Sequence, residues 1–290
     1  MHDATAQKLN YFKLLDQPFN NTRDTRFFYE SSVHGEALSR LLFLAQDGNM
    51  GMGLLTGEIG CGKTMTRTVL HKRLDPRRYK VVSIENCLLE FDYLLLEIIS
   101  QIKGERIRTS ELPDRYSRLA EFKSLLVHEF MGSGRHLVVM LDEAQQLSDT
   151  DLEGVKGLTN IASERENFVT MILIGQPELR EKVRRLPQVD QRISLRYHLK
   201  PLSAAETFRY LEHRMHVAGL EGPPPFTREA VMLICKACRG IPREINRLCK
   251  LALDYAIAHE RSVVGADIVE MVYRDLRRHE GTFDPGGEVF

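Results

Sequence analysis

Two patterns of apolar residues alternate along most of the chain, one typical of strands and one typical of helices. Short runs in which nearly every residue is apolar fit strands buried on both faces, whereas apolar residues spaced three or four apart fit amphipathic helices. The strand pattern covers residues 52–56, 79–84, 137–141 and 169–175, and helical spacing covers 34–44, 65–74, 91–102 and 115–131. Strands that alternate with helices predict a parallel sheet with helices on both faces, which is an α/β fold.

Residues 191–199 have a different pattern. Apolar side chains at Ile193, Leu195, Tyr197 and Leu199 alternate strictly with polar ones. This period of two predicts a strand that is buried on one face only, as at the edge of a sheet.

The character of the chain changes after residue 202, where only helical patterns remain. A capping box at Ser203 predicts the start of the first of these helices. An earlier capping box at Ser148, within the α/β part, predicts a helix that runs toward Ser163. Further helices are expected over 227–239, 242–259 and 264–278. We therefore expect an N-terminal arm at 1–33, an α/β domain at 34–200, an all-helical subdomain at 201–279 and a disordered tail at 280–290.

The composition excludes several classes of protein. The 40 basic and 40 acidic residues give a net charge of zero, so the composition does not indicate a broad basic surface for binding nucleic acid. A local basic patch is still compatible with it. No apolar run approaches the roughly 20 residues of a membrane-spanning helix, and the N-terminus lacks the pattern of a signal peptide. The five cysteines suit a reducing compartment. These features predict a cytoplasmic protein without direct membrane insertion.

The first chemical motif follows the strand at 52–56. Residues 57–64 read GEIGCGKT, which fits the phosphate-binding P-loop, and a helical pattern follows it, as the motif requires. Glycines let successive backbone N–H groups point into one concavity that binds phosphate. Lys63 would reach the β- and γ-phosphates of ATP, and the Thr64 hydroxyl would bind magnesium. The expected nucleotide contacts are Gly57, Glu58, Gly60, Cys61, Gly62, Lys63, Thr64 and Met65.

Two carboxylates follow the apolar strand at 137–141. Ligands of parallel sheets lie beyond the carboxyl ends of the strands, where Asp142 and Glu143 are expected. Asp142 would help hold magnesium, and Glu143 would polarise the water that attacks the γ-phosphate. The alternative, a solvated acidic turn, is disfavoured by the P-loop upstream.

Two further stretches allow more than one interpretation. Gln176 follows the strand at 169–175, where its side chain would sense the γ-phosphate or simply belong to a turn that Pro177 explains. Cys235 and Cys238 have the spacing of a metal or redox pair, but both fall on one apolar helix face, which favours core cysteines.

Several motifs in combination resemble those of the ExeA-type (general secretion pathway protein A) family of AAA+ ATPases. That family is similar to the transposition ATPases of the MuB, TniB and TnsC type. The motifs span about residues 8 to 275 and include Asp142-Glu143-Ala144-Gln145. The others are Pro18-Phe19, His34-Gly35-Glu36-Ala37-Leu38, Leu55-Thr56-Gly57-Glu58, Ile174-Gly175-Gln176-Pro177-Glu178-Leu179-Arg180, Gln191-Arg192-Ile193 and Gly240-Ile241-Pro242-Arg243-Glu244-Ile245-Asn246.

The resemblance implies roles for further residues. Gln176 would be sensor 1, and Arg243 would be sensor 2 at the start of a helix in the lid, as residues 201–279 are called in this family. His34 would join the nucleotide contacts. Arg192 would be an arginine finger donated to a neighbouring subunit, with Arg196 as the alternative.

The resemblance also implies two functions. The first is an ATP-switched ring or helical filament that binds double-stranded DNA and presents it to a transposase. The second is a cytoplasmic ATPase for secretion or pilus assembly without DNA binding. The secretion protein of the family carries a transmembrane segment that this sequence lacks, so we favour the first function.

Overall fold

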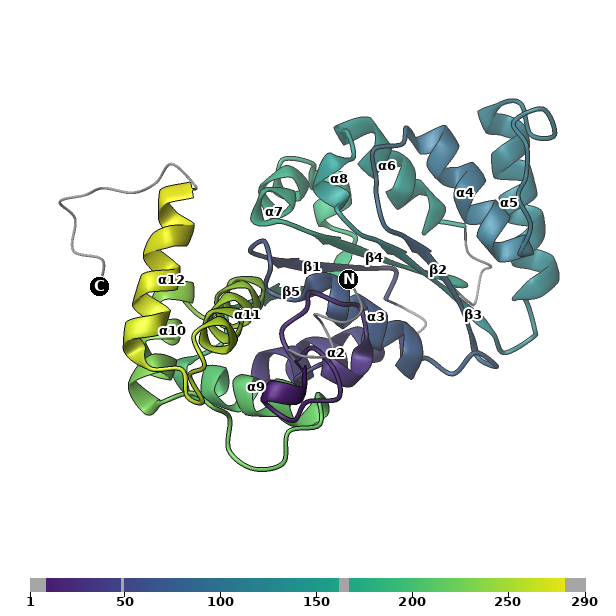
Figure 1. The fold of residues 1–290 in the computed structure, drawn as a ribbon. Coiled ribbons are helices and arrows are strands. Elements are labelled where there is room, and N and C mark those ends of the chain that lie inside the picture. The colour runs from purple at the N-terminus through teal and green to yellow at the C-terminus, as the bar shows by residue number, and fades with distance from the viewer. Residues whose placement is uncertain (1–8, 48–49, 162–166, 280–290) are drawn as a thin grey trace. The chain divides into compact units, whose positions relative to one another are not determined.

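The computed structural model describes residues 9–47, 50–161 and 167–279 (Figure 1). It forms two compact units. The sheet unit comprises residues 34–59 and 63–199, and the helical unit comprises the described residues before 34, residues 60–62 at the tip of the P-loop, and residues from 200 onward.

The sheet unit is built on five parallel strands in the order β2-β3-β4-β1-β5. Their bounds are β1 Met52–Gly57, β2 Tyr79–Ile84, β3 His136–Leu141, β4 Val169–Gly175 and β5 Ile193–Leu199. The three central strands are almost wholly buried, whereas β5, at the edge, is buried only at Ile193 and Leu199 and is exposed or half-buried between them. Both the parallel sheet and the edge strand predicted from the sequence are confirmed.

Helices cover both faces of this sheet. In Figure 1, α2 and α3 lie on one face, and α4 to α8 lie on the other. Their bounds are α2 Ser32–Gln46, α3 Lys63–Arg73, α4 Phe91–Lys103, α5 Arg115–Glu129, α6 Asp149–Leu158, α7 Pro177–Arg184 and α8 Pro187–Asp190, with a 3-10 turn η2 at Ala144–Gln146. Apolar side chains of α4, α5 and α6 form one buried core with β2, β3 and β4.

The helical unit has its own core. It contains the 3-10 turn η1 Thr25–Phe27 and the helices α9 Ala204–Val217, α10 Arg228–Cys238, α11 Pro242–Ala258 and α12 Ala266–His279. Cys238 is buried in this core and Cys235 packs against it, as expected for core cysteines. The Arg214 guanidinium is buried, and its NH2 group donates to the Asn20 carbonyl oxygen at 2.7 Å, which ties the arm to α9.

Several helices differ by a few residues from their predicted bounds, and contacts explain the differences in α2 and α6. Helix α2 begins at Ser32, two residues earlier than expected, because the Ser32 N–H has a partner in Glu206. Helix α6 ends at Leu158 instead of continuing toward Ser163, because the Thr159 hydroxyl donates to the Lys156 carbonyl oxygen and closes the last turn. Ser163 itself and the predicted tail at 280–290 lie outside the described residues.

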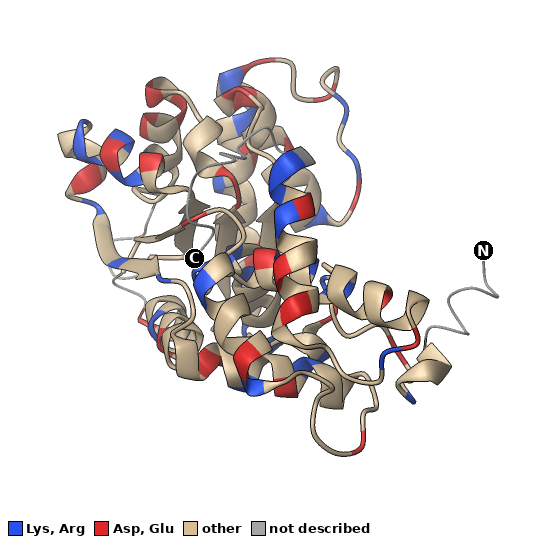
Figure 2. Cartoon of the chain, turned by 60° about the vertical axis from the view of Figure 1, so that its left-hand side comes forward, with Lys and Arg blue, Asp and Glu red and all other residues tan. Residues whose placement is uncertain are grey.

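Charge is mixed along the chain. Figure 2 shows Lys and Arg interspersed with Asp and Glu on most helices, in keeping with the net charge of zero. No helix in the described ranges is long and apolar enough to cross a membrane.

Candidate functional site

The P-loop connects the end of β1 to the start of α3. Gly60 and Gly62 have φ angles of 83° and 98°, in the left-handed region that favours glycine. These two turns curl the backbone around the N-terminus of α3, and backbone N–H groups at a helix N-terminus attract anions. The loop therefore has the backbone conformation that phosphate binding requires.

Lys63 is the first residue of α3, and its side chain is buried within this loop. Its ammonium donates hydrogen bonds to the carbonyl oxygens of Gly57 and Glu58, at 2.7 and 3.0 Å. A buried ammonium needs a compensating anion or several acceptors. Lys63 thus holds its positive charge inside the loop, where a phosphate would bind.

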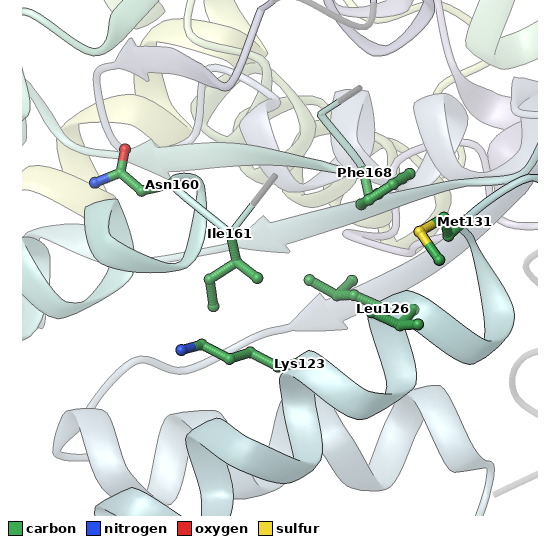
Figure 3. Close-up of a pocket in the computed structure, with 7 residues that line it drawn as sticks. Lys123, Leu126, Met131, Asn160, Ile161 and Phe168 are labelled. Atoms are coloured by element: carbon green, nitrogen blue, oxygen red, sulfur yellow. The ribbon is translucent and has the colours of Figure 1, made fainter. Parts of the chain in front are cut away.

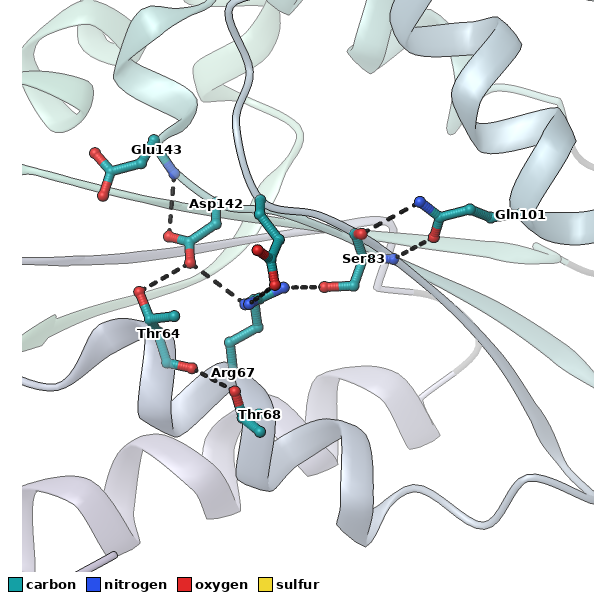
Figure 4. Close-up of polar contacts among 8 residues, drawn as sticks. Thr64, Arg67, Thr68, Ser83, Gln101, Asp142 and Glu143 are labelled. Carbon is teal, nitrogen blue, oxygen red and sulfur yellow. Dashed lines mark hydrogen bonds and ion pairs between the residues drawn. The ribbon is translucent and has the colours of Figure 1, made fainter. Parts of the chain in front are cut away.

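Asp142 follows β3 at the carboxyl edge of the sheet and faces α3 (Figure 4). Its Oδ2 accepts a hydrogen bond from the Thr64 hydroxyl at 3.0 Å and forms an ion pair with Arg67 Nε at 3.3 Å. Arg67 also pairs with Glu85 at 3.0 Å and donates to the Ser83 hydroxyl, so its guanidinium joins α3 to the end of β2. Asp142 is thus fixed from two sides.

Burial changes the acid–base properties of this edge. Burial raises the pKa of Asp142, while the charge of Arg67 and the hydrogen bond from Thr64 act to lower it. Burial also raises the pKa of the Cys87 thiol to about 12, and the negative charges of Asp142 and Glu143 add to that effect. Cys87 is therefore a neutral thiol at physiological pH rather than a nucleophile.

Glu143 lies next to Asp142 but points away from Thr64 and Arg67 (Figure 4). Its backbone has a φ of 55°, and its N–H donates to Asp142 Oδ1 at 3.0 Å. Its Oε2 accepts from the side-chain amide of Gln145 at 2.6 Å, and Gln176 Nε2 lies 3.4 Å from the same oxygen. The structure thus brings Glu143 and Gln176, predicted separately, to one place.

Sequence reasoning missed Arg67 and Gln145. Arg67 lies four residues after Lys63, one helical turn on, so helical spacing alone places it near the phosphate-binding loop. Gln145 lies in the motif quoted for the family resemblance, two residues after Glu143. Arg67 meets Asp142 and Glu85, and Gln145 meets Gln176, only once the strands are assembled, which is why these contacts were not foreseen.

The two candidate arginine fingers differ in their surroundings. Arg196 donates to the Asp190 carboxylate at 2.7 Å and to the Asp190 carbonyl oxygen at 2.6 Å. Arg192 lies in the turn before β5 and is exposed, and its guanidinium makes no hydrogen bond or ion pair with any residue in the described ranges. Arg196 is thus held by its own subunit, whereas Arg192 is available to another molecule.

Arg243 is in the first turn of α11, in the helical unit. Its backbone N–H donates to the Gly60 carbonyl oxygen at 3.3 Å, and its side chain is exposed. A Cβ atom at Gly60 would lie 2.7 Å from the Cβ of Arg243, so this approach requires glycine. His34 is buried near the start of α2 and Met65 is half-buried in α3. The contacts of Arg243, His34 and Met65 with a nucleotide remain predictions.

A second concavity lies at the opposite, amino edge of the sheet (Figure 3). It has a volume of about 540 Å³ and lies among α5, the segment after α6 and Phe168, which precedes β4. Its lining is mostly apolar, with Lys123 and Asn160 as the polar members. Its described lining residues include no carboxylate or nucleophile, whereas those described at the carboxyl edge do include carboxylates.

The residues at the carboxyl edge fit a magnesium nucleotide. A hard cation takes oxygen ligands, and the hydroxyl of half-buried Thr64 and the carboxylate of buried Asp142 are two oxygens held together by a hydrogen bond. The turns at Gly60 and Gly62 and the buried ammonium of Lys63 suit phosphate.

The chain is similar to known proteins over most of its length. The family described as "AAA domain" matches residues 46–183. General secretion pathway protein A of Aeromonas hydrophila is 36% identical over 286 residues, which is 95% of this chain. The chain spans about half the length of that relative, 50%.

Solved structures share the fold. The ORC2 protein of Aeropyrum pernix superposes with a TM-score of 0.61 at 22% identity, covering 83% of this chain and 66% of that one. Drosophila ORC bound to DNA has a TM-score of 0.62 at 19% identity, covering 86% of this chain and 62% of that one. With the parallel sheet and the P-loop, these similarities show the fold of an AAA domain, in a chain that is similar to general secretion pathway protein A.

Proposed function

We propose that the chain binds ATP with Mg²⁺ at the carboxyl edge of its sheet and uses hydrolysis to switch an oligomer between two states. The observation that carries this proposal is the convergence of Lys63, Thr64, Asp142 and Glu143 from the P-loop and the end of β3. Lys63 would neutralise the β- and γ-phosphates.

The roles of the acidic residues follow from their different surroundings. Asp142, buried between Thr64 and Arg67, would hold magnesium together with the Thr64 hydroxyl. When bound, magnesium neutralises the charge that develops on the phosphate oxygens. Glu143, whose carboxylate faces away from that pair, would accept a proton from the attacking water. Gln176, within reach of Glu143, would sense the γ-phosphate.

The positive charge for the transition state would come in part from a second subunit. The exposed guanidinium of Arg192 has no partner in the described part of its own chain, whereas Arg196 is bound to Asp190. An arginine finger contributes roughly 10³–10⁵ in turnover. A ring or helical filament in which Arg192 reaches the next site would therefore make hydrolysis depend on assembly. Arg243 would supply a further cation as sensor 2.

The proposed partner of the assembled form is double-stranded DNA, presented to a transposase. Drosophila ORC, whose fold is similar, has been solved bound to DNA, and this motivates the choice of partner. Basic candidates in the sheet unit include Arg77, which pairs with Asp75, and Lys103, which pairs with Glu121. Arg106 and Arg108, in the segment between α4 and α5, are candidates as well. Such scattered contacts would bind phosphates rather than read bases.

A second candidate function is assembly of secretion or pilus machinery without DNA. The 36% identity to general secretion pathway protein A over 95% of this chain favours it. Both functions use the same ATP switch and differ in the surface that meets the partner.

One experiment separates these functions. Binding of a fluorescent DNA duplex is measured by anisotropy with ATP and magnesium, with ADP and without nucleotide, across a salt series. The DNA function predicts binding with ATP only, affinity that falls steeply with salt, and no ATP effect in Lys63→Ala. Absence of binding with ATP at low salt would remove that function and leave the secretion function.

A further inference from the structure

Gln145 joins two loops of the active site that come from different strands. It belongs to η2, directly after Glu143, and its side chain is half-buried. Its Nε2 donates to Glu143 Oε2 at 2.6 Å, and its Oε1 accepts from the backbone N–H of Gln176 at 3.2 Å. One amide therefore bridges the end of β3 and the end of β4.

The chemistry of the partners fixes the direction of this amide. An ionised carboxylate accepts hydrogen bonds only, and a backbone N–H donates only. The NH2 group must therefore face Glu143 and the oxygen must face Gln176. No other residue type of this length has one donor and one acceptor on the same planar group, so glutamate or lysine would lose one of the two bonds.

The surroundings leave room for this bridge. A Cβ atom at Gly175 would lie 2.6 Å from Gln145 Oε1, so glycine at the end of β4 makes space for the amide. The Lys182 ammonium, on α7, donates to the carbonyl oxygens of Gln145 and Leu147 at 2.9 and 2.6 Å. The backbone of η2 and the side chain of Gln145 are thus both tied to the β4–α7 segment.

The bridge acts on a residue with an unusual backbone. Glu143 has a φ of 55°, which is uncommon for a residue other than glycine and must be held by its neighbours. We propose that Gln145 is a positioning residue that holds the Glu143 carboxylate in its catalytic orientation and links it to the β4–α7 segment carrying Gln176. This inference rests on the proposed role of Glu143 as the base for the attacking water.

The test compares four variants of the full chain. Gln145→Ala should bind ATP as the wild type does but have kcat lowered by about 10- to 100-fold, the effect of one hydrogen bond to a charged group. Gln145→Glu should be no better, because a carboxylate cannot donate to Glu143. Gln146→Ala is the matched control, since Gln146 is exposed and adjacent. Glu143→Gln, measured in parallel, tests the base itself.

A double-mutant cycle separates positioning from general damage. Gly175→Ala should lower kcat in the wild type by displacing the amide, yet have much less effect in Gln145→Ala, where the amide is absent. A residual effect in that background would come from Leu179, whose Cδ2 lies 2.8 Å from the added Cβ position. A purely structural effect of Gly175→Ala would be equal in both backgrounds.

The outcomes are distinguishable. If Glu143→Gln hydrolyses ATP at the wild-type rate, the proposed role of Glu143 is wrong. If Glu143→Gln stalls while Gln145→Ala keeps or exceeds the wild-type kcat, the inference about Gln145 is overturned and the proposed function stands. Equal effects of Gly175→Ala in both backgrounds would also overturn it.

Discussion

Replacing Glu206 by glutamine should destabilise the helical unit in a pH-dependent way. The carboxylate of Glu206, which is 9% exposed, accepts four hydrogen bonds. Oε1 accepts from the N–H and hydroxyl of Ser32 at 3.0 and 2.7 Å, and Oε2 accepts from those of Ser203 at 3.0 and 2.8 Å. One side chain thus caps the starts of both α2 and α9.

The size of the effect follows from the titration of this group. Burial acts to raise the pKa of Glu206, but the hydrogen bonds from Ser203 and Ser32 outweigh it and lower the pKa from 4.5 to about 2. At 1.36 kcal/mol per pKa unit, that difference amounts to about 3 kcal/mol of stability. Because the pKa is lowered on folding, this contribution is present above pH 4.5 and is lost as the pH falls toward 2.

The free energy of unfolding is measured by urea denaturation followed by circular dichroism, because the chain has no tryptophan to report unfolding by fluorescence. In Glu206→Gln the amide NH2 cannot accept from a backbone N–H, so at least one helix start loses its cap. We expect a lower midpoint at pH 7 and a gap to the wild type that narrows below pH 4.5. Glu212→Gln, an exposed site in the same helix, is the control. An unchanged midpoint at pH 7, or a gap that stays constant below pH 4.5, would refute the reasoning.

Two further predictions concern the nucleotide site. Lys63→Ala should abolish productive ATP binding, whereas Glu143→Gln should bind ATP but stall hydrolysis, as measured by nucleotide affinity and turnover; wild-type turnover in Glu143→Gln would contradict this. Arg67→Met should lower the stability by about 3–5 kcal/mol, because it leaves Asp142 as a buried charge without its cation. Arg67 acts to lower the pKa of Asp142, so the acid limb of the ATPase pH profile should move to higher pH in Arg67→Met. An acid limb that does not move would argue against the pairing of Arg67 with Asp142. Arg73→Met, at an exposed position of the same helix, is the control.

The sequence predicted those features that depend on local pattern. Central parallel strands are buried on both faces, so β3 and β4 appear in the sequence as continuous apolar runs. Ligands of parallel sheets lie beyond the carboxyl ends of the strands, which places Asp142 and Gln176 at one edge. Glu143 and Gln176 do lie within 3.4 Å of each other. The order of the strands in the sheet could not be predicted, because the residue pattern of a strand does not indicate which other strands pair with it.

Features that depend on distant partners were missed. Ser32 begins α2 because Glu206, 174 residues away, accepts its N–H. Arg67 resembles an exposed helical arginine until Asp142 and Glu85 are brought to it from two other strands. Helix α8 has four residues, too few to show a helical period.

Mixing two inactive variants tests the central claim, an ATPase site completed by a neighbouring subunit. Lys63→Ala has no working P-loop but an intact Arg192, and Arg192→Ala has the reverse. Arg192→Lys should not substitute, because lysine lacks the bidentate guanidinium. If Arg192 acts in the next subunit, the mixture should regain part of the ATPase activity that neither variant has alone. No regain, in mixtures shown to be folded and co-assembled, would contradict a finger donated between subunits.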